Sequence, residues 1–296
     1  MSEPQLHMHS WSLSPVITFV LVIPALFYFR GWFCLRKALP NLIAGWRLAA
    51  FLSGLFLAWI AVASPLATLD HQSLTIHMIK HLLLMTVAAP LVLAGAPEFP
   101  IMCGLPKLFI TGDCVLRNWR VRWLEHRPAH FALCWLAGTV VVIGWHLPVT
   151  FQLAVRSHWV HGAEGACFFF AGMLFWLPIV QLVPSKARSH QWSMALYLFL
   201  ATLPCDILSA FLVFCDRLVY ADYQSTTQLF SLSPLQDQAC AGALMWVWTT
   251  FAYVTPAVVI TMQILTPPKR DSDALVQGAS DRLVERSLKG FGAEVP

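Results

Sequence analysis

The sequence predicts an all-α membrane protein, a polytopic bundle of seven transmembrane helices. Of its 296 residues, 58% are hydrophobic and only 11% are charged, and the mean hydropathy is +0.65. A soluble domain would carry roughly 25% charged residues. The 13 Trp and 20 Phe are typical of helices packed in lipid, with aromatic rings at the membrane interfaces. No run of basic residues interleaved with aromatic ones suggests nucleic-acid binding.

Seven apolar stretches are long enough to cross a bilayer as helices. We expect these spans at residues 14–29, 42–64, 72–94, 129–149, 159–182, 191–214 and 238–265. The first span is short, and Pro24 interrupts it. Prolines also lie within or near later spans, where neighbouring helices can satisfy the carbonyl groups that a proline leaves unbonded.

The distribution of Lys and Arg predicts the orientation of the bundle. Sixteen of the 19 lie in the connections 30–47, 95–128 and 183–190 or in the C-terminal tail, which all fall on one side. Because basic residues are enriched in cytoplasmic connections, we expect the N-terminus outside and the C-terminus in the cytoplasm. Residues 1–13 would then form an outer tail, 14–265 the membrane domain and 266–296 a cytoplasmic tail. The expected location is the cell's inner (plasma) membrane.

The third span carries the most informative polar residues. His77, Lys80 and His81 lie near its outer end, and ionisable groups at membrane depth usually serve a function. On a helix, His77 and His81 share one face, and Met85 continues that face one turn further. Two imidazoles and a thioether in a row favour a soft-metal site. The alternative is that the histidines merely hydrogen-bond to Ser or Thr across helices. Met78 stands where a zinc protease would need a glutamate, which makes that enzyme class a poor fit.

Further candidate residues open or close the neighbouring spans. His146 ends the fourth span at a depth that matches His77, although it could be merely interfacial. His161 and Glu164 share a face at the start of the fifth span. Glu164 could orient the His161 imidazole, or it could simply favour the positive end of the helix dipole.

Two aspartates complete the outer-side set. Asp237 precedes the last span, where its most probable role is to cap that helix. Asp206 lies in the outer half of the sixth span, where an unpaired carboxylate would be costly. We therefore expect Lys80 to pair with Asp206 or with Glu164.

An ordered set of short motifs covers roughly residues 45–265. The motifs are Ser64-Pro65-Leu66, His77-Met78-x-x-His81, Ala89-Pro90-Leu91, Trp145-His146-Leu147-Pro148, His161-x-x-Glu164, Phe175-Trp176-Leu177-Pro178 and Asp237-Gln238-x-x-x-Gly242-x-x-Met245-Trp246. In this order they resemble the CtaG family of membrane assembly factors for caa-type haem-copper cytochrome c oxidases. The resemblance implies a seven-span integral protein that is needed to make active terminal oxidase and that handles copper.

Chemistry and resemblance together predict a non-enzymatic copper-handling protein. The expected ligands for Cu(I) on the outer side are His77, His81, His146 and His161, assisted by Met78 or Met85. Glu164 and Asp237 would orient these ligands or steer cations. Partners would be cytochrome c oxidase subunits and membrane lipid. The alternatives are a haem-binding membrane cytochrome, in which histidines clamp the haem iron, and a copper permease.

The orientation is directly testable. Reporter fusions at Ala187 and Thr227 should report a cytoplasmic and an outer location respectively, because the basic connections are predicted to lie inside. Paired phosphatase and fluorescent-protein reporters measure this. The opposite pattern would invalidate the predicted depths of all the histidines.

Overall fold

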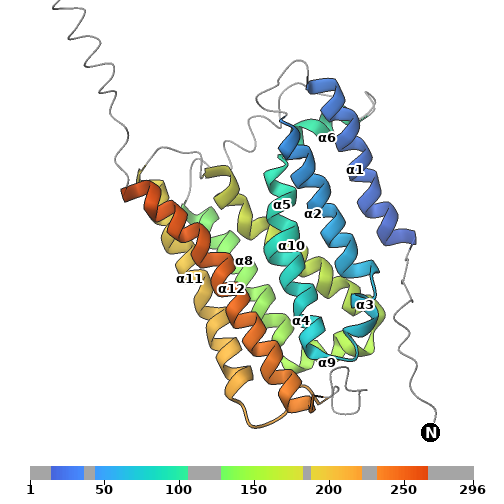
Figure 1. Ribbon diagram of the computed structural model, residues 1–296, viewed down its shortest axis with the longest axis vertical. Helices are drawn as coiled ribbons and strands as arrows, with labels where there is room; N and C mark the ends of the chain where they lie inside the picture. Colours follow the sequence, from blue (N-terminus) through green and yellow to red (C-terminus); the bar gives the residue numbers. More distant parts are fainter. Residues whose placement is uncertain (1–14, 37–43, 106–127, 183–187, 222–231, 266–296) are drawn as a thin grey trace, which may run out of the picture.

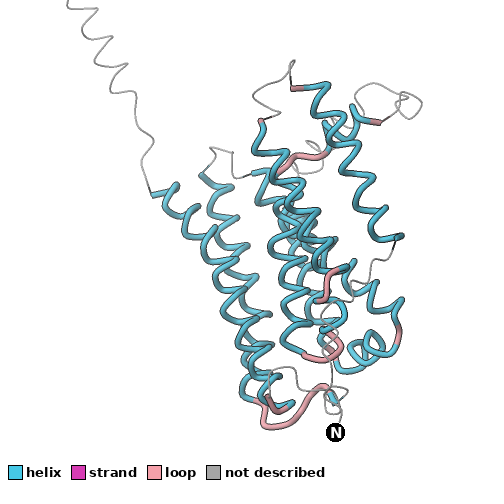
Figure 2. Tube along the Cα trace, turned by 45° about the vertical axis from the view of Figure 1, so that its right-hand side comes forward, coloured by secondary structure: helices cyan, strands magenta, loops and turns pink. Residues whose placement is uncertain are grey.

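The computed structural model describes residues 15–36, 44–105, 128–182, 188–221 and 232–265, and every regular element in these ranges is helical. The long helices run side by side, with α1 at one edge and the α11–α12 pair at the other (Figures 1 and 2). The elements are α1 (Pro15–Leu35), α2 (Gly45–Ala63), α3 (Leu66–Leu69), α4 (Leu74–Leu82), the π-helix η1 (Leu83–Ala88), α5 (Ala89–Ala94), α6 (Glu98–Gly104), α8 (Pro128–His146), α9 (Pro148–Arg156), α10 (His158–Leu182), α11 (Arg188–Phe214) and α12 (Pro234–Leu265). The predicted tails 1–13 and 266–296 lie outside the described residues.

Within the described residues, six helices are long and apolar enough to cross a membrane, with α4, η1 and α5 acting as one. A seventh crossing is available if α8 and α9, which meet at 73°, count as one bent span. The predicted all-α membrane bundle is therefore confirmed. The predicted fourth span, 129–149, extends too far, because α8 ends at His146. Pro148 disfavours helical backbone in the preceding residue, and Leu147 is indeed extended, with ψ 136°.

The first span also differs from the prediction. It continues to Leu35 instead of ending at residue 29, and Pro24 lies inside an unbroken helix. Its far half packs closely on α6, a short helix that the sequence analysis did not predict. The backbones meet without side chains between them, since a Cβ on Gly31 would lie 1.7 Å from the carbonyl oxygen of Pro100.

The third span is not a uniform α-helix. Its central turn, η1, is a π-helix, a form that is rare and often found at functional sites. The indole of Trp176 donates a hydrogen bond of 3.0 Å to the Met85 carbonyl, and the Thr86 hydroxyl donates one of 2.6 Å to the Leu82 carbonyl. Pro90 follows directly and has no N–H to donate to the preceding turn. These side-chain bonds satisfy carbonyl groups around the π-helical turn.

The main apolar core lies between α5, α8, α10, α11 and α12. It includes Phe175, Trp176, Tyr197 and Tyr253, whose rings lie within 6 Å of one another in successive pairs. The polar buried residues gather instead where α4 and α10 begin, near the end of the bundle that holds α3 and α9 (Figure 1). The fold thus separates an apolar half from a polar pocket of histidines and acids.

Close packing of α10 on the π-helix gives a stability prediction. In Gly172→Ala, the new Cβ would lie 2.7 Å from the Met85 carbonyl oxygen and 2.9 Å from its Cα, so the helices must separate. We expect a loss of about 1–3 kcal/mol, the usual cost of overpacking. Gly162→Ala in the same helix is the matched control, because its Cβ meets nothing within 4 Å. Thermal unfolding in detergent measures both, and equal unfolding temperatures would contradict the close contact.

Candidate metal centre

Glu164 of α10 lies among three imidazoles. Its Oε1 is 3.4 Å from the Nε2 of His77 and 3.4 Å from the Nε2 of His81, and its Oε2 is 3.3 Å from the Nδ1 of His161. The two α4 histidines lie one turn apart, which brings their Nε2 atoms to 2.9 Å from each other. One ligand atom from each of His77, His81 and Glu164 lies within 4.8 Å of the other two. The predicted shared face of His77 and His81 is thus realised.

The charge of this cluster is incomplete. Glu164 is 1% exposed, and its ionic neighbours among the described residues are the three histidines, with no lysine or arginine. Its Oε2 and the Nδ1 of His81 are buried without a hydrogen-bond partner. An ionised carboxylate at this depth needs a positive charge nearby. A cation held by His77, His81 and Glu164 would supply that charge, and these donors match a nitrogen–oxygen metal site.

A second cluster adjoins the first on the side toward α3. Asp70 follows α3 and is fully buried, and its Oδ2 lies 2.9 Å from the Nε2 of His161. The ammonium of Lys80 contacts the same carboxylate oxygen and lies 2.6 Å from the same imidazole nitrogen. Burial opposes ionisation of Asp70, but the His161 hydrogen bond and the Lys80 charge outweigh it and hold the pKa of Asp70 well below its usual range.

The position of Lys80 distinguishes the two clusters as candidate metal sites. Asp70, His71 and His161 also place ligand atoms within 4.8 Å of one another. The Lys80 ammonium already contacts Asp70 and His161, so a positive charge is present there. The predicted pairing of Lys80 with Asp206 or Glu164 is therefore wrong. Asp70 lies just before the span and ten residues from Lys80, so its carboxylate is not among the acidic groups of the predicted spans.

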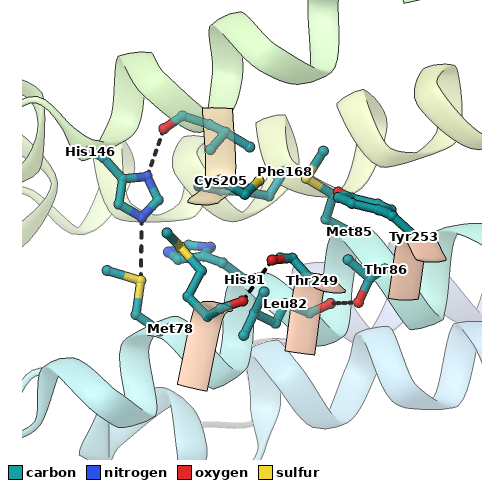
Figure 3. A pocket seen from close by; sticks show the side chains of 12 residues that line it. Met78, His81, Leu82, Met85, Thr86, His146, Phe168, Cys205, Thr249 and Tyr253 are labelled. Carbon is teal, nitrogen blue, oxygen red and sulfur yellow. Dashed lines mark hydrogen bonds between the residues drawn. The ribbon is translucent and has the colours of Figure 1, made fainter. Parts of the chain in front are cut away.

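The four predicted histidine ligands do not form one compact set. His161 joins the two clusters, since its Nδ1 faces Glu164 while its Nε2 faces Asp70. His146, at the end of α8, contacts Met78 instead, with its Nε2 3.4 Å from the thioether sulfur (Figure 3). Met85 lies one turn below His81 and lines the same cavity as His146.

Asp237 acts on another helix than the one predicted. It lies within the first turn of α12, and its carboxylate accepts hydrogen bonds from the backbone N–H groups of Leu74 and Thr75, at 2.7 and 3.2 Å. The hydroxyls of Ser73 and Thr75 donate to the same carboxylate, at 2.9 and 2.6 Å. Asp237 thus caps α4 from across the bundle and fixes the start of the helix that carries His77.

Asp206 has no part in either cluster. It is half-buried on α11, and its Oδ1 is buried without a hydrogen-bond partner. Its depth in the sixth span suggested a partner for Lys80, but depth alone does not determine which helix faces it. Two residues near the clusters, Asp70 and His71, were not predicted as site residues.

The fold and the buried cluster define a class: a helical integral membrane protein with a histidine–carboxylate centre near one end of the bundle. A family comparison makes this specific. The chain belongs to the cytochrome c oxidase caa3 assembly factor family (Caa3_CtaG), whose model matches residues 26–266. A search of curated proteins and a search of solved structures found no significant match. The family predicted from the motifs is thereby confirmed.

The Lys80–Asp70 contact gives a rescue prediction. Lys80→Met should lower the protein level and its thermal stability, because breaking a buried ion pair from one side costs about 3–5 kcal/mol. Adding Asp70→Asn should restore part of the loss, since it removes the uncompensated charge. Asp206→Asn added to Lys80→Met is the control and should restore nothing. Immunoblots of membranes and unfolding in detergent measure this, and rescue by Asp206→Asn alone would refute the pairing.

Proposed function

We propose that this cytochrome c oxidase assembly factor is an integral protein of the plasma membrane that binds copper at its outer side and passes it to oxidase subunits. The observation that carries the proposal is the buried charge of Glu164, faced by three imidazoles and by no lysine or arginine among the described residues. Imidazole nitrogen suits copper, and a haem-copper oxidase must acquire that metal during assembly.

His77, His81 and Glu164 would hold the ion. Their ligand atoms are already close enough for one shared metal, since metal–nitrogen distances are about 2 Å. His161 would support Glu164 through its Nδ1, and Asp237 would fix the helix end from which His77 projects. The 16 Lys and Arg that the sequence assigns to the predicted cytoplasmic connections and tail support an outer location for this end of the bundle.

The geometry weighs against both alternatives. The cavity beside His81 and His146 has a volume of about 20 Å³, which is room for a water molecule or an ion but not for a haem macrocycle. A permease needs polar groups through the other half of the bundle. Below His81, the described face of the third span continues with Met85, Ala89 and Leu93, which pack into the apolar core. We likewise assign no catalytic reaction, since the cluster offers ligands for an ion and not a paired nucleophile and base.

The test compares two carboxylate substitutions of equal chemistry. Glu164→Gln should weaken copper binding by the purified protein and lower oxidase activity in membranes, while the protein level stays near wild type. Asp206→Asn is the matched control, because that carboxylate lies in a span but outside both clusters. His77→Ala should resemble Glu164→Gln, and added copper should partly restore activity because mass action offsets lost affinity.

Metal analysis after anaerobic copper loading, with oxidase assays in a strain that lacks the native protein, gives the readout. The proposal fails if the wild-type protein binds no copper. It also fails if Glu164→Gln and Asp206→Asn behave alike in both assays. A purified protein with a Soret band would instead support the haem alternative.

A further inference from the structure

A small internal cavity beside the histidine–carboxylate cluster collects sulfur atoms. It lies between α4, η1, α8, α10, α11 and α12, and its volume is about 20 Å³ (Figure 3). Its lining includes three thioethers, one thiol and two imidazoles, from Met78, Met85, Met245, Cys205, His81 and His146. These groups come from five separate elements, α4, η1, α8, α11 and α12. Three of the protein's nine methionines line this one cavity.

The tautomer of His146 points to an ion. Its Nδ1 lies 2.6 Å from the Val142 carbonyl, which can only accept, so Nδ1 carries the proton. In a neutral ring, Nε2 then has a lone pair, and this lone pair faces the Met78 sulfur at 3.4 Å. Two acceptors thus face each other with no proton between them. A backbone carbonyl bonded to one ring nitrogen is also the usual support for a histidine whose other nitrogen binds a metal.

The separation of the two atoms also fits a shared ion. With metal–nitrogen and metal–sulfur distances of about 2.0 and 2.3 Å, a 3.4 Å gap corresponds to an angle of roughly 105° at the metal. That angle is close to tetrahedral, and it leaves room for further ligands from the cavity wall. His146 is itself held in place, because the hydroxyl of Tyr220 donates a 2.9 Å hydrogen bond to its carbonyl.

His81 borders both the histidine–carboxylate cluster and the sulfur-lined cavity. Its Nε2 faces His77 and Glu164, while its ring forms part of the cavity wall with Met78 and His146. Its other nitrogen, Nδ1, is buried without a hydrogen-bond partner, and the whole side chain is 4% exposed. One residue therefore connects the nitrogen–oxygen cluster with the sulfur-lined cavity.

We propose that this cavity is a second metal site, selective for Cu(I), with His146 and Met78 as its first two ligands and Met245 completing it. Thioether ligands favour soft ions such as Cu(I) over hard ions such as Mg²⁺ and Ca²⁺. The rest of the wall is apolar except for Thr86 and Thr249, whose hydroxyls donate to backbone carbonyls, and it carries no carboxylate. A monovalent ion costs far less to bury there than a divalent one. The proposal rests on the copper-handling function above only for the identity of the metal.

A second site implies a direction for copper transfer, from the histidine–carboxylate cluster to the sulfur-lined cavity. An ion at His77, His81 and Glu164 would lie next to the polar outer end, whereas an ion at His146 and Met78 would lie beside the buried rings of Phe168 and Tyr253. Because His81 touches both positions, an ion can move between them without passing through lipid or water. The deeper site would hold the metal in its reduced form, away from the Glu164 carboxylate.

X-ray absorption of the purified wild-type protein loaded anaerobically with Cu(I) is the first test. Sulfur neighbours about 2.3 Å from copper are expected, together with nitrogen neighbours. Met78→Leu combined with Met245→Leu should remove the sulfur signal and weaken Cu(I) binding about tenfold or more in competition with a chromophoric chelator. The change nearly conserves volume, so folding should survive. Met194→Leu is the matched control, since Met194 is equally buried but lies outside the cavity.

The outcomes separate the two proposals. Copper surrounded only by nitrogen and oxygen in the wild-type protein at saturating Cu(I) overturns the second site and leaves the first intact. A double methionine variant that keeps the sulfur signal also overturns it. Sulfur-bound copper that persists in Glu164→Gln, with no loss of metal in that variant, would support the second site while refuting the first. Zn²⁺ that competes equally with Cu(I) for the cavity would refute its selectivity.

Discussion

A carboxylate that is 1% exposed, in a bundle whose other interior surfaces are largely apolar, must be neutralised locally or it will not remain ionised. Glu164 is faced by imidazoles from α4 and from its own helix, and the proposed cation would supply the positive charge that neutral imidazoles do not. The relative placement of α4 and α10 follows from that contact. A bundle without Glu164 would leave His77 and His81 as two buried rings that face each other across 2.9 Å with no common partner. The site and the helix crossing are thus one structural unit.

Polar residues next to the cluster also hold α4 in place where it crosses α10. Asp237 caps α4 through its carboxylate, so the last helix determines where the third span begins. Gln238, the next residue, is fully buried and accepts a hydrogen bond of 2.8 Å from the Val219 backbone, which ties α12 to the chain that follows α11. Asp237 and Gln238 therefore fix α12 against two neighbouring segments, the start of α4 and the chain that follows α11. The motif that contains them supports the site's framework and supplies no ligand to the cluster.

Much of this architecture follows from the sequence because hydropathy and helical spacing are local properties. The spans 159–182 and 191–214 match α10 and α11 within three residues, and the His77–His81 face is present as spacing requires. Partner choice depends on how helices rotate about their axes, which no local pattern encodes. For that reason the sequence suggested Asp206 as the partner of Lys80. In the structure the partner is Asp70, which lies in a turn. Asp237 looked like the cap of its own helix because cap rules consider only neighbours in sequence.

The four histidines were expected to converge because they lie at similar depth in the predicted spans. Depth alone does not determine where a side chain lies around the bundle. His146 reaches the expected level, but its imidazole faces the thioether of Met78 and not the Glu164 carboxylate. The π-helical turn has a related consequence for the third span as a whole. A π-helical turn contains one residue more than an α-helical turn, so deletion of a single residue from 83–88 would restore regular winding. The remainder of the span would then rotate by about 100°. The extra residue of the π-helical turn therefore determines how Met85 and the residues after it are rotated about the helix axis relative to His81. It sets the relative rotation of the polar and apolar halves of the protein along this span.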